Sequence, residues 1–404
     1  MLEMEVTSLF NASGPIDEEH FFAGRSKQVR QLMEAVFERS RHAVLFGERG
    51  VGKTSLGNIF WKRFSPNLQS VIAARIQADP SDNFTSLWIK GLRELKSNAT
   101  ARGRGDQLPL DTNFDVLSPD DIRREFQKAS PNSLPILIID EFDKIEDPSV
   151  IQLVANTIKY LSDYSVTATI VIVGVAESLA ELIKEHESIK RCLTQVPLER
   201  MDTAELREIV EKRLGETPMK ITGDAKWKII MLARGLPFYV HILSKYAVSA
   251  AIRRHSLEIA EVDVDVAIER FINETDQTFY DDYQTAVSTH QPDNLFQEVL
   301  LACAIADSDE RGFFTPTNVI DPLSRILGKR VEIANFQRHL NEFVQPGRGN
   351  VLIRKGKERQ YKYRFRDPMM QPYVVIKGIY EDMIDEQTRA TLRFPEQGEL
   401  SITR

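Results

Sequence analysis

Eight consecutive residues carry the strongest chemical signal in the chain: Gly47 to Thr54 read Gly-Glu-Arg-Gly-Val-Gly-Lys-Thr. Glycines permit backbone conformations in which successive N–H groups point inward at one anion. A lysine followed by a hydroxyl residue is the pattern in which the amine contacts the β- and γ-phosphates of a nucleotide and the hydroxyl binds Mg²⁺. The loop therefore predicts nucleotide contacts by Gly47, Glu48, Arg49, Gly50, Val51, Gly52, Lys53, Thr54 and Ser55, with Lys53 also catalytic and Thr54 also a metal ligand.

Two carboxylates at the end of an apolar run form the second chemical element. The segment from Ser133 to Ile139 is almost wholly apolar and leads into Asp140 and Glu141, as expected of a parallel strand that is buried on both faces. Asp140 is predicted to hold the water shell of Mg²⁺, and Glu141 to polarise an attacking water. The pair therefore predicts hydrolysis as well as binding. An acidic helix cap after a core strand is the alternative, and Asp143 and Glu146 would fit that alternative.

These residues need a strand before the loop and a helix after it. A short apolar run from His42 to Phe46 predicts the strand, and apolar residues recur at helical spacing from Leu56 to Phe64. Two further apolar runs, residues 167–175 and 194–198, predict more core strands. The loop, the carboxylates and these runs together predict an α/β core with a parallel sheet.

The two motifs and the order of the segments resemble the AAA+ class of P-loop ATPases, especially its origin-recognition/Cdc-six-like branch and the neighbouring STAND ATPases. The resemblance covers most of the chain and implies an ATP hydrolase that uses ATP and Mg²⁺, with its core in residues 1–200. The stretch Phe21-Phe22-Ala23-Gly24-Arg25 is similar to the element with which these ATPases wall the adenine. The resemblance thus implies nucleotide contacts by Phe22 and Arg25, whereas an ordinary helix start is the alternative.

The resemblance also draws attention to two positions near the later strands. A polar residue, often Asn, ends the third strand of these ATPases and senses the γ-phosphate. The nearest matches here are Glu177 and Ser178, so the chain departs from a pattern that bears on the efficiency of hydrolysis. Arg191 precedes the last strand, where AAA+ proteins carry an arginine that reaches the nucleotide of a neighbouring subunit. This position implies a catalytic Arg191 and a homo-oligomer, with a solvated helix end as the alternative.

Residues 201–280 are predicted to form a small helical lid. Leu206, Ile209, Val210 and Leu214 lie on one helix face, and further helices fit residues 224–233 and 237–253. The sequence Gly235-Leu236-Pro237 is similar to a STAND feature, whereas AAA+ initiators usually carry a sensing arginine on this helix. Pro237 and His241 are therefore candidate nucleotide contacts. A histidine on an apolar helix is more often a packing residue, and that alternative stays open.

Residues 285–380 are predicted to form a winged helix. Helices fit near 294–306, 316–327 and 333–344, and a hairpin follows whose second strand alternates aromatic and basic residues. The basic face is expected to contact double-stranded DNA through Arg354, Lys355, Lys357, Lys362 and Arg364. A solvated edge is the alternative for a basic hairpin, and in STAND proteins a winged helix is an internal switch.

Composition further limits the classes of protein to which the chain can belong. A chain of 404 residues with 42% hydrophobic residues suits two to four domains, and a net charge of −7 argues against a uniformly nucleic-acid-coated surface. No apolar stretch reaches membrane-spanning length, the N-terminus lacks signal-peptide features, and Cys192 and Cys303 are too few for a disulfide framework. We therefore expect a cytoplasmic protein without membrane contact.

Three functions fit the whole chain. The first is a DNA-associated AAA+ machine that oligomerises under nucleotide control, and the second is a STAND-type switch in bacterial signalling or anti-phage defence that binds no DNA. The third is a nucleotide-held scaffold with negligible turnover. The chain shows no nuclease or protease signature, so any output is expected from a separate effector protein. Residues 97–118 are expected to be a flexible loop, and the tail, residues 381–404, receives no role.

Overall fold

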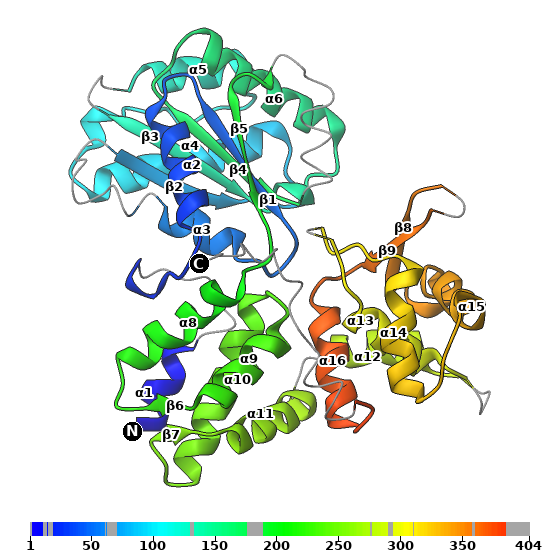
Figure 1. Cartoon of the computed structure of the whole chain (residues 1–404). Coiled ribbons are helices and arrows are strands. Elements are labelled where there is room, and N and C mark those ends of the chain that lie inside the picture. Colours follow the sequence, from blue (N-terminus) through cyan, green and yellow to red (C-terminus); the bar gives the residue numbers. More distant parts are fainter. Residues whose placement is uncertain are drawn as a thin grey trace, which may run out of the picture. The chain divides into compact units, whose positions relative to one another are not determined.

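The computed structural model describes residues 2–10, 14, 19–60, 62, 71–129, 133–175, 189–274, 277–289, 294–309, 311–357 and 360–384. The chain forms two compact units (Figure 1). The core unit comprises Pro15–Glu48 and Gly52–Leu198, and the C-terminal unit comprises Met1–Gly14, Arg49–Val51 and Glu199–Arg404. Among the described residues, no helix has both the length and the apolar character that crossing a membrane requires.

A five-stranded parallel sheet with the order β2-β3-β4-β1-β5 forms the centre of the core unit. Its strands are β1 (His42–Gly47), β2 (Val71–Gln77), β3 (Leu134–Asp140), β4 (Thr169–Gly174) and β5 (Leu193–Leu198). The strands are rich in branched apolar residues because helices cover both faces of the sheet. Since all five strands run parallel, their carboxyl ends share one edge of the sheet, and the glycine loop and Asp140 both lie at that edge.

Helices flank this sheet on both sides. They are α2 (Ser26–Phe37), α3 (Lys53–Ile59), α4 (Phe84–Ala101), α5 (Pro119–Gln127) and α6 (Pro148–Asp163), with short 3-10 turns η1 (Glu19–Phe21), η2 (Gly105–Gln107) and η3 (Phe142–Lys144). One face carries α4, because Gly91 of this helix directly faces Leu137 of β3. The opposite face carries α3, because a Cβ at Gly57 would lie 3.7 Å from the side chain of Ile138. Successive residues of β3 therefore point to different helices.

The segment 97–118 is not the flexible loop that the sequence predicts. Its first residues continue α4 to Ala101, and Leu108, Leu110 and Leu117 are buried in the same apolar cluster as Trp88. Lys96 also donates a hydrogen bond of 2.9 Å to the carbonyl oxygen of Leu110. The three leucines outweigh the Arg-Gly repeat that precedes them at residues 102–105, because burying three large apolar side chains fixes the segment on the core.

The lid helices belong to the C-terminal unit. They are α8 (Thr203–Gly215), α9 (Gly223–Ala233), α10 (Pro237–Arg253), α11 (Glu261–Glu274) and α12 (Gln277–Val287), with two-residue strands β6 (Lys220–Ile221) and β7 (Glu258–Ile259). The N-terminal helix α1 (Leu2–Leu9) packs on them. Arg213 of α8 donates a hydrogen bond of 2.9 Å to the carbonyl oxygen of Leu9. Residues 1–14 thus group with the lid, in contrast to the single core expected for residues 1–200.

The expected winged helix follows the lid. It contains α13 (Phe296–Ile305), α14 (Pro316–Leu327), α15 (Ile333–Phe343), η5 (Pro346–Arg348), the antiparallel strands β8 (Leu352–Lys355) and β9 (Lys362–Phe365), and α16 (Met370–Tyr380). Phe314 bridges to Tyr363 of β9, and both side chains are fully buried. The fold class is therefore confirmed: a P-loop α/β core, a helical lid and a winged helix.

Lid and winged helix share one aromatic core. Tyr373 of α16 contacts Phe271 of α11 and the rings of Phe279 and Tyr283 of α12, with centroid distances of 5.7 to 6.2 Å. Tyr239 of α10 packs on Phe271 and donates a hydrogen bond to the carbonyl oxygen of Met369. Because these rings are buried together, separating α16 from the lid would expose a large apolar area to water. The two parts therefore form one body.

Candidate nucleotide site

The glycine loop joins the end of β1 to the start of α3, and different structural constraints require glycine at its different positions. Gly50 and Gly52 have φ angles of +83° and +94°, which side chains strongly disfavour. Gly47 has no space for a side chain, because a Cβ there would collide with the carbonyl oxygen of Leu198 on the neighbouring strand β5. The backbone thus adopts the open loop that an anion site needs, at the edge where the strands end.

Lys53 folds back over this loop. Its Nζ atom donates hydrogen bonds to the carbonyl oxygens of Gly47 at 3.0 Å and Glu48 at 2.8 Å. The ammonium group therefore lies over the loop, and a phosphate in the loop would lie within its reach. Thr54 and Ser55 follow in the first turn of α3, where both are half-buried.

Asp140 is the last residue of β3, and its side chain is buried. One carboxylate oxygen, Oδ1, accepts the backbone N–H of Glu141 at 2.9 Å. The other, Oδ2, accepts a hydrogen bond of 3.2 Å from the Nη1 atom of Arg75 on β2. Arg75 was not predicted from the sequence to belong to the site, although an arginine inside the apolar strand Val71–Gln77 is unusual and is the signal that marks it.

Glu141 leaves the strand through a left-handed turn, with φ 55° and ψ 35°. Its Oε2 atom forms an ion pair of 2.7 Å with Nζ of Lys144, a residue that was not predicted from the sequence to belong to the site. The hydrogen bond and the charge of Glu141 raise the pKa of Lys144, and the negative charges of Asp79 and Asp143 add to this shift. Lys144 is therefore the counter-ion of Glu141 at this edge of the sheet.

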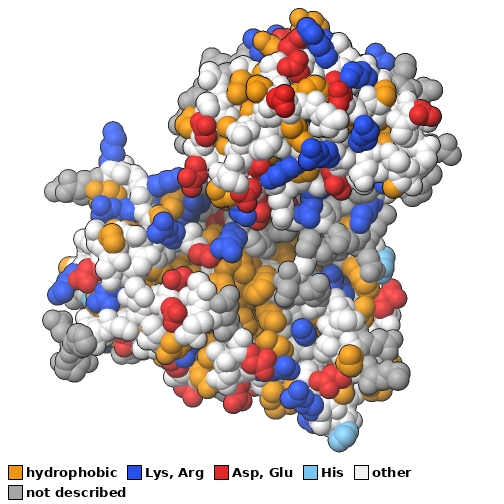
Figure 2. All heavy atoms as spheres, turned by 180° about the vertical axis from the view of Figure 1, so that it is seen from behind, with side chains coloured by type: hydrophobic (Ala, Val, Ile, Leu, Met, Phe, Trp, Pro, Cys, Tyr) orange, Lys and Arg blue, Asp and Glu red, His pale blue; other side chains and the backbone are white. Residues whose placement is uncertain are grey.

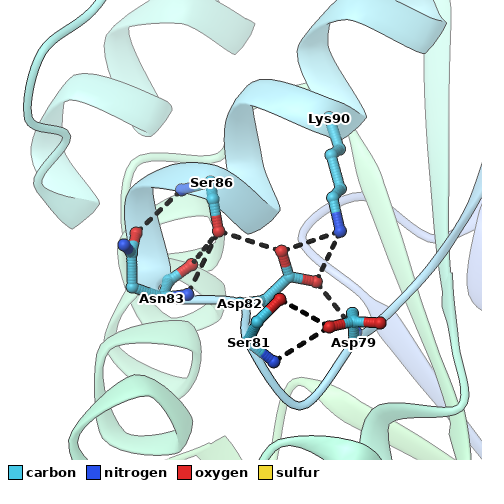
Figure 3. Close-up of polar contacts among 6 residues, drawn as sticks. All are labelled: Asp79, Ser81, Asp82, Asn83, Ser86 and Lys90. Carbon is cyan, nitrogen blue, oxygen red and sulfur yellow. Dashed lines mark hydrogen bonds and ion pairs between the residues drawn. The ribbon is translucent and has the colours of Figure 1, made fainter.

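The neighbouring connection from β2 to α4 is held by a buried carboxylate (Figure 3). Asp82 accepts hydrogen bonds from the backbone N–H of Asp79 at 2.8 Å, from Ser86 Oγ at 2.9 Å and from Lys90 Nζ at 2.8 Å. Asn83 caps α4 through the backbone N–H of Ser86. This network fixes the chain next to β3, where the N–H of Ala78 donates to the carbonyl oxygen of Asp140 at 2.9 Å.

Asp143 has a structural task at the same edge. Its Oδ1 atom accepts the backbone N–H of Val175 at 3.1 Å, which ties η3 to the end of β4. Glu177 and Ser178, the nearest matches to a phosphate-sensing residue, lie outside the described residues.

The chemistry of the donors fits Mg²⁺. Asp140 and Thr54 offer a carboxylate and a hydroxyl, which are the hard oxygen ligands that this ion prefers. In the described part of the chain, no three His, Cys, Asp or Glu side chains gather into a metal-binding group.

A comparison with protein families matches residues 14–301 to the family described as novel STAND NTPase 1. The match spans more than half of the chain. The chain belongs to the novel STAND NTPase 1 family. The resemblance to P-loop ATPases close to the STAND group is thereby confirmed, and the family is one of nucleoside triphosphatases. A search of curated proteins gives no match.

Solved structures agree with this STAND NTPase in fold. The ORC1 protein of Aeropyrum pernix in complex with DNA is 15% identical, with a TM-score of 0.50, and the alignment covers 93% of this chain and 97% of that one. A Walker-type ATPase of Pyrococcus abyssi is 16% identical, with a TM-score of 0.50, and the alignment covers 91% and 99% of the two chains. At this identity, the likeness shows a shared fold.

The structure places the remaining predicted residues of the core unit in different settings. Phe22 and Arg25 are both buried at 4% exposure, and Arg25 adopts a left-handed conformation immediately before α2. Arg191 is exposed and forms an ion pair of 3.1 Å with Asp163 at the end of α6. An exposed arginine is sterically accessible for a contact between subunits, but the pair with Asp163 also fits a solvated surface. The roles of all three residues stay predictions.

Pro237 and His241 belong to α10. Pro237 is its first residue, where proline suits a helix, and Gly235 before it has φ +83° and faces the Cβ atom of Arg200. His241 is buried at 4% exposure with the ring of Phe10 beside it, and burial lowers its pKa to about 3. A neutral, buried imidazole of this kind favours the packing alternative, and the roles of Pro237 and His241 in this STAND NTPase stay predictions.

The hairpin of the winged helix gathers the predicted basic residues on one element. Arg354 lies over the ring of Tyr361 at 4.2 Å, Arg364 lies over Phe313 at 4.9 Å, and Lys362 pairs with Asp309 at 3.1 Å. Lys355 and Lys357 are exposed. Within β9 the aromatic residues Tyr363 and Phe365 are buried and alternate with Lys362 and Arg364, as predicted. Arg354 of β8 instead pairs with Tyr363 and so lies on the same face of the hairpin as that ring. Figure 2 shows Lys and Arg side chains interspersed with Asp and Glu side chains, so the face in view is not uniformly basic.

A polar network that sequence reasoning missed joins the lid to the winged helix. Arg200 donates from Nη1 to the side-chain oxygen of Gln371 at 2.6 Å and to the carbonyl oxygen of Arg234 at 3.2 Å. Gln371 donates to the carbonyl oxygen of Ala304 at 2.9 Å. No local pattern signals these partners, because they lie up to 171 residues apart in the chain.

Proposed function

We propose that this protein is a Mg²⁺-dependent ATP hydrolase whose nucleotide state controls its assembly and its binding to a partner. The observation that carries the proposal is the set of groups at one edge of the parallel sheet. There, the glycine loop has positive φ angles at Gly50 and Gly52, Lys53 lies over the loop, Asp140 ends β3 and Glu141 follows it. Family membership supports nucleotide chemistry at this loop.

In this proposal, each group has a distinct task. Lys53 exchanges its bonds to the loop carbonyls for bonds to phosphate oxygens, and the backbone N–H groups from Glu48 to Ser55 cradle the phosphates. Thr54 and Asp140 hold Mg²⁺, which supplies positive charge beside the phosphates when it is bound. Glu141 accepts the proton of the attacking water once its carboxylate is released from Lys144. Phe22, Arg25 and Pro237 are the proposed contacts to the remainder of the nucleotide.

The C-terminal unit provides a means of transmitting nucleotide state. Its lid and winged helix share the aromatic core around Tyr373 and the hydrogen bonds of Arg200 and Gln371. A change at the lid would therefore move the winged helix with it, since breaking these contacts separates buried groups. This coupling supports the switch function of STAND ATPases over a scaffold that only holds nucleotide.

The test of assembly is the mass in solution with ADP and with a non-hydrolysable ATP analogue. We expect a larger assembly with the analogue, and turnover per molecule that rises with protein concentration. Arg191→Ala should remove that rise, because an arginine supplied by a neighbouring subunit stabilises charge in the transition state. Such an arginine raises the turnover rate by about 10³-fold or more. Arg124→Ala is the matched control, since Arg124 is likewise exposed and ion-paired with an aspartate. Equal masses with both nucleotides would contradict controlled assembly.

Double-stranded DNA is a second candidate partner, favoured by the exposed cations of the β8-β9 hairpin. Gel-shift titrations of duplex DNA over a salt series test it. Replacing Arg354 and Lys355 with glutamine should weaken binding and reduce the salt slope by about 2, because each substitution leaves one phosphate without its cation. Replacing Lys212 and Lys226 of the lid, which are ion-paired lysines, is the control. Absence of binding by the parent protein at low salt would leave a protein effector as the partner.

A further inference from the structure

The proposed metal carboxylate already has a cationic partner within the chain. Arg75 donates from Nη1 to Oδ2 of Asp140 at 3.2 Å, and the remaining oxygen of Asp140 accepts a backbone N–H. The Asp140 side chain is only 3% exposed, so its charge is shielded from solvent. A buried carboxylate of this kind is stable as an anion only when a cation or several donors compensate it.

Arg75 is placed for this contact by the sheet. Strands β2 and β3 pair in parallel, with Gln77 opposite Asp140. Arg75 therefore lies two residues before the carboxyl end of β2, at the same edge of the sheet as Asp140. Its neighbours Ala74 and Ile76 belong to the apolar cluster under α4, and the side chain of Arg75 points to the other face. Asp140 shares that face with Ile138, which α3 covers. Arg75 and Asp140 thus meet on the side of the sheet that carries Lys53 and Thr54.

Two other cations that the structure describes near this edge have different partners. Lys144 pairs with Glu141 at 2.7 Å, and Lys53 donates to the carbonyl oxygens of Gly47 and Glu48. The guanidinium of Arg75 is therefore the charge that compensates Asp140 among the contacts of the described residues. It also occupies one of the two carboxylate oxygens of the proposed metal ligand Asp140.

We propose that Arg75 is a positioning residue that neutralises Asp140 in the nucleotide-free protein and competes with Mg²⁺ for its Oδ2 atom. This inference rests on the proposed function of the site. Two cations that use the same carboxylate oxygen repel each other, so the metal binds only as Arg75 withdraws. Arg75 then sets the Mg²⁺ concentration at which the site becomes loaded, while it protects the buried carboxylate when no metal is bound.

The experiment measures binding of a fluorescent, non-hydrolysable ATP analogue over a Mg²⁺ series. Arg75→Gln retains a hydrogen-bond donor but removes the charge, and we expect its half-maximal Mg²⁺ concentration to fall by about tenfold, a change equivalent to ~1.4 kcal/mol. Arg102→Gln is the matched control, because Arg102 donates to the carbonyl oxygen of Val71 at the opposite end of the same strand. Arg102→Gln should keep the Mg²⁺ midpoint of the parent protein. Asp140→Asn should lose most of the Mg²⁺ dependence.

A second measurement covers the case in which Arg75→Gln folds poorly. Arg75→Lys keeps the positive charge, and its Mg²⁺ midpoint should stay within about threefold of that of the parent protein. The melting temperature of Arg75→Gln should rise more on addition of Mg²⁺ and the analogue than that of the parent protein does. An unchanged or higher Mg²⁺ midpoint in Arg75→Gln, with nucleotide still bound, overturns the competition. Failure of the parent protein to bind nucleotide at any Mg²⁺ concentration overturns the proposed function instead.

Discussion

Lys53→Ala is expected to weaken ATP binding by about a hundredfold or more. Hydrogen bonds between a charged donor and its acceptor contribute about 1.5–3 kcal/mol each, and the lysine ammonium is proposed to contact two phosphates. The loop itself should survive, because its shape depends on Gly47, Gly50 and Gly52 and on the contact with β5. The measurement is equilibrium binding of a fluorescent ATP analogue in the presence of Mg²⁺.

The Lys53 variant needs a control for folding. Its Nζ atom donates to two loop carbonyls, so a small drop in melting temperature is expected when these bonds are removed. Lys27→Ala removes an exposed lysine from α2 in the same unit and should leave nucleotide affinity unchanged. Parent-like affinity in Lys53→Ala would refute the assignment of the loop as the phosphate site.

Glu141→Gln is expected to lower ATP turnover by about 10²–10⁴-fold while nucleotide binding is retained. A general base contributes rate enhancement of this size, and an amide cannot accept the proton of the attacking water. The substitution preserves side-chain length and can still accept a hydrogen bond from Lys144, so the turn into η3 should form as before. Turnover is measured as phosphate release at saturating ATP and Mg²⁺.

The neighbouring Glu146 provides the comparison for Glu141. Glu146 is an exposed carboxylate five residues further along the chain, and Glu146→Gln should keep the parent rate. Undiminished hydrolysis in Glu141→Gln would remove Glu141 from the proposed role. Negligible turnover in the parent protein itself, with tight nucleotide binding, would favour a nucleotide-held scaffold.

Local patterns predicted much of this fold. The glycine loop between β1 and α3, the strand that ends in Asp140 and the three helices of the winged helix all follow from signals within about twenty residues. Such signals suffice because residues close together in the sequence determine both the hydrophobic period of a helix or strand and the residue types of a loop. The burial of Tyr363 and Phe365, which alternate with Lys362 and Arg364 along β9, was predictable for the same reason.

The partners of the site residues could not be predicted from such local signals. Arg75 reaches Asp140 only because β2 and β3 pair in a particular register, and the sequence does not state which strands are neighbours. Lys144 is close to Glu141 in sequence, but the contact depends on a left-handed turn at Glu141, where a non-glycine residue is uncommon. Arg200 and Gln371 meet through tertiary packing alone.

The packing of α1 on the lid has a consequence for the order of folding. Phe10 and Leu9 find their partners His241 and Arg213 only after more than two hundred further residues have been made. At a synthesis rate of about 5–20 residues per second, roughly tens of seconds pass between the synthesis of α1 and the synthesis of the lid helices on which it packs. The core unit, which lies between the two halves of this contact in the chain, can complete its sheet first. The nascent chain can therefore contain a folded core unit while α1 is still unpacked. Helix α1 packs only once the lid helices have been synthesised and folded.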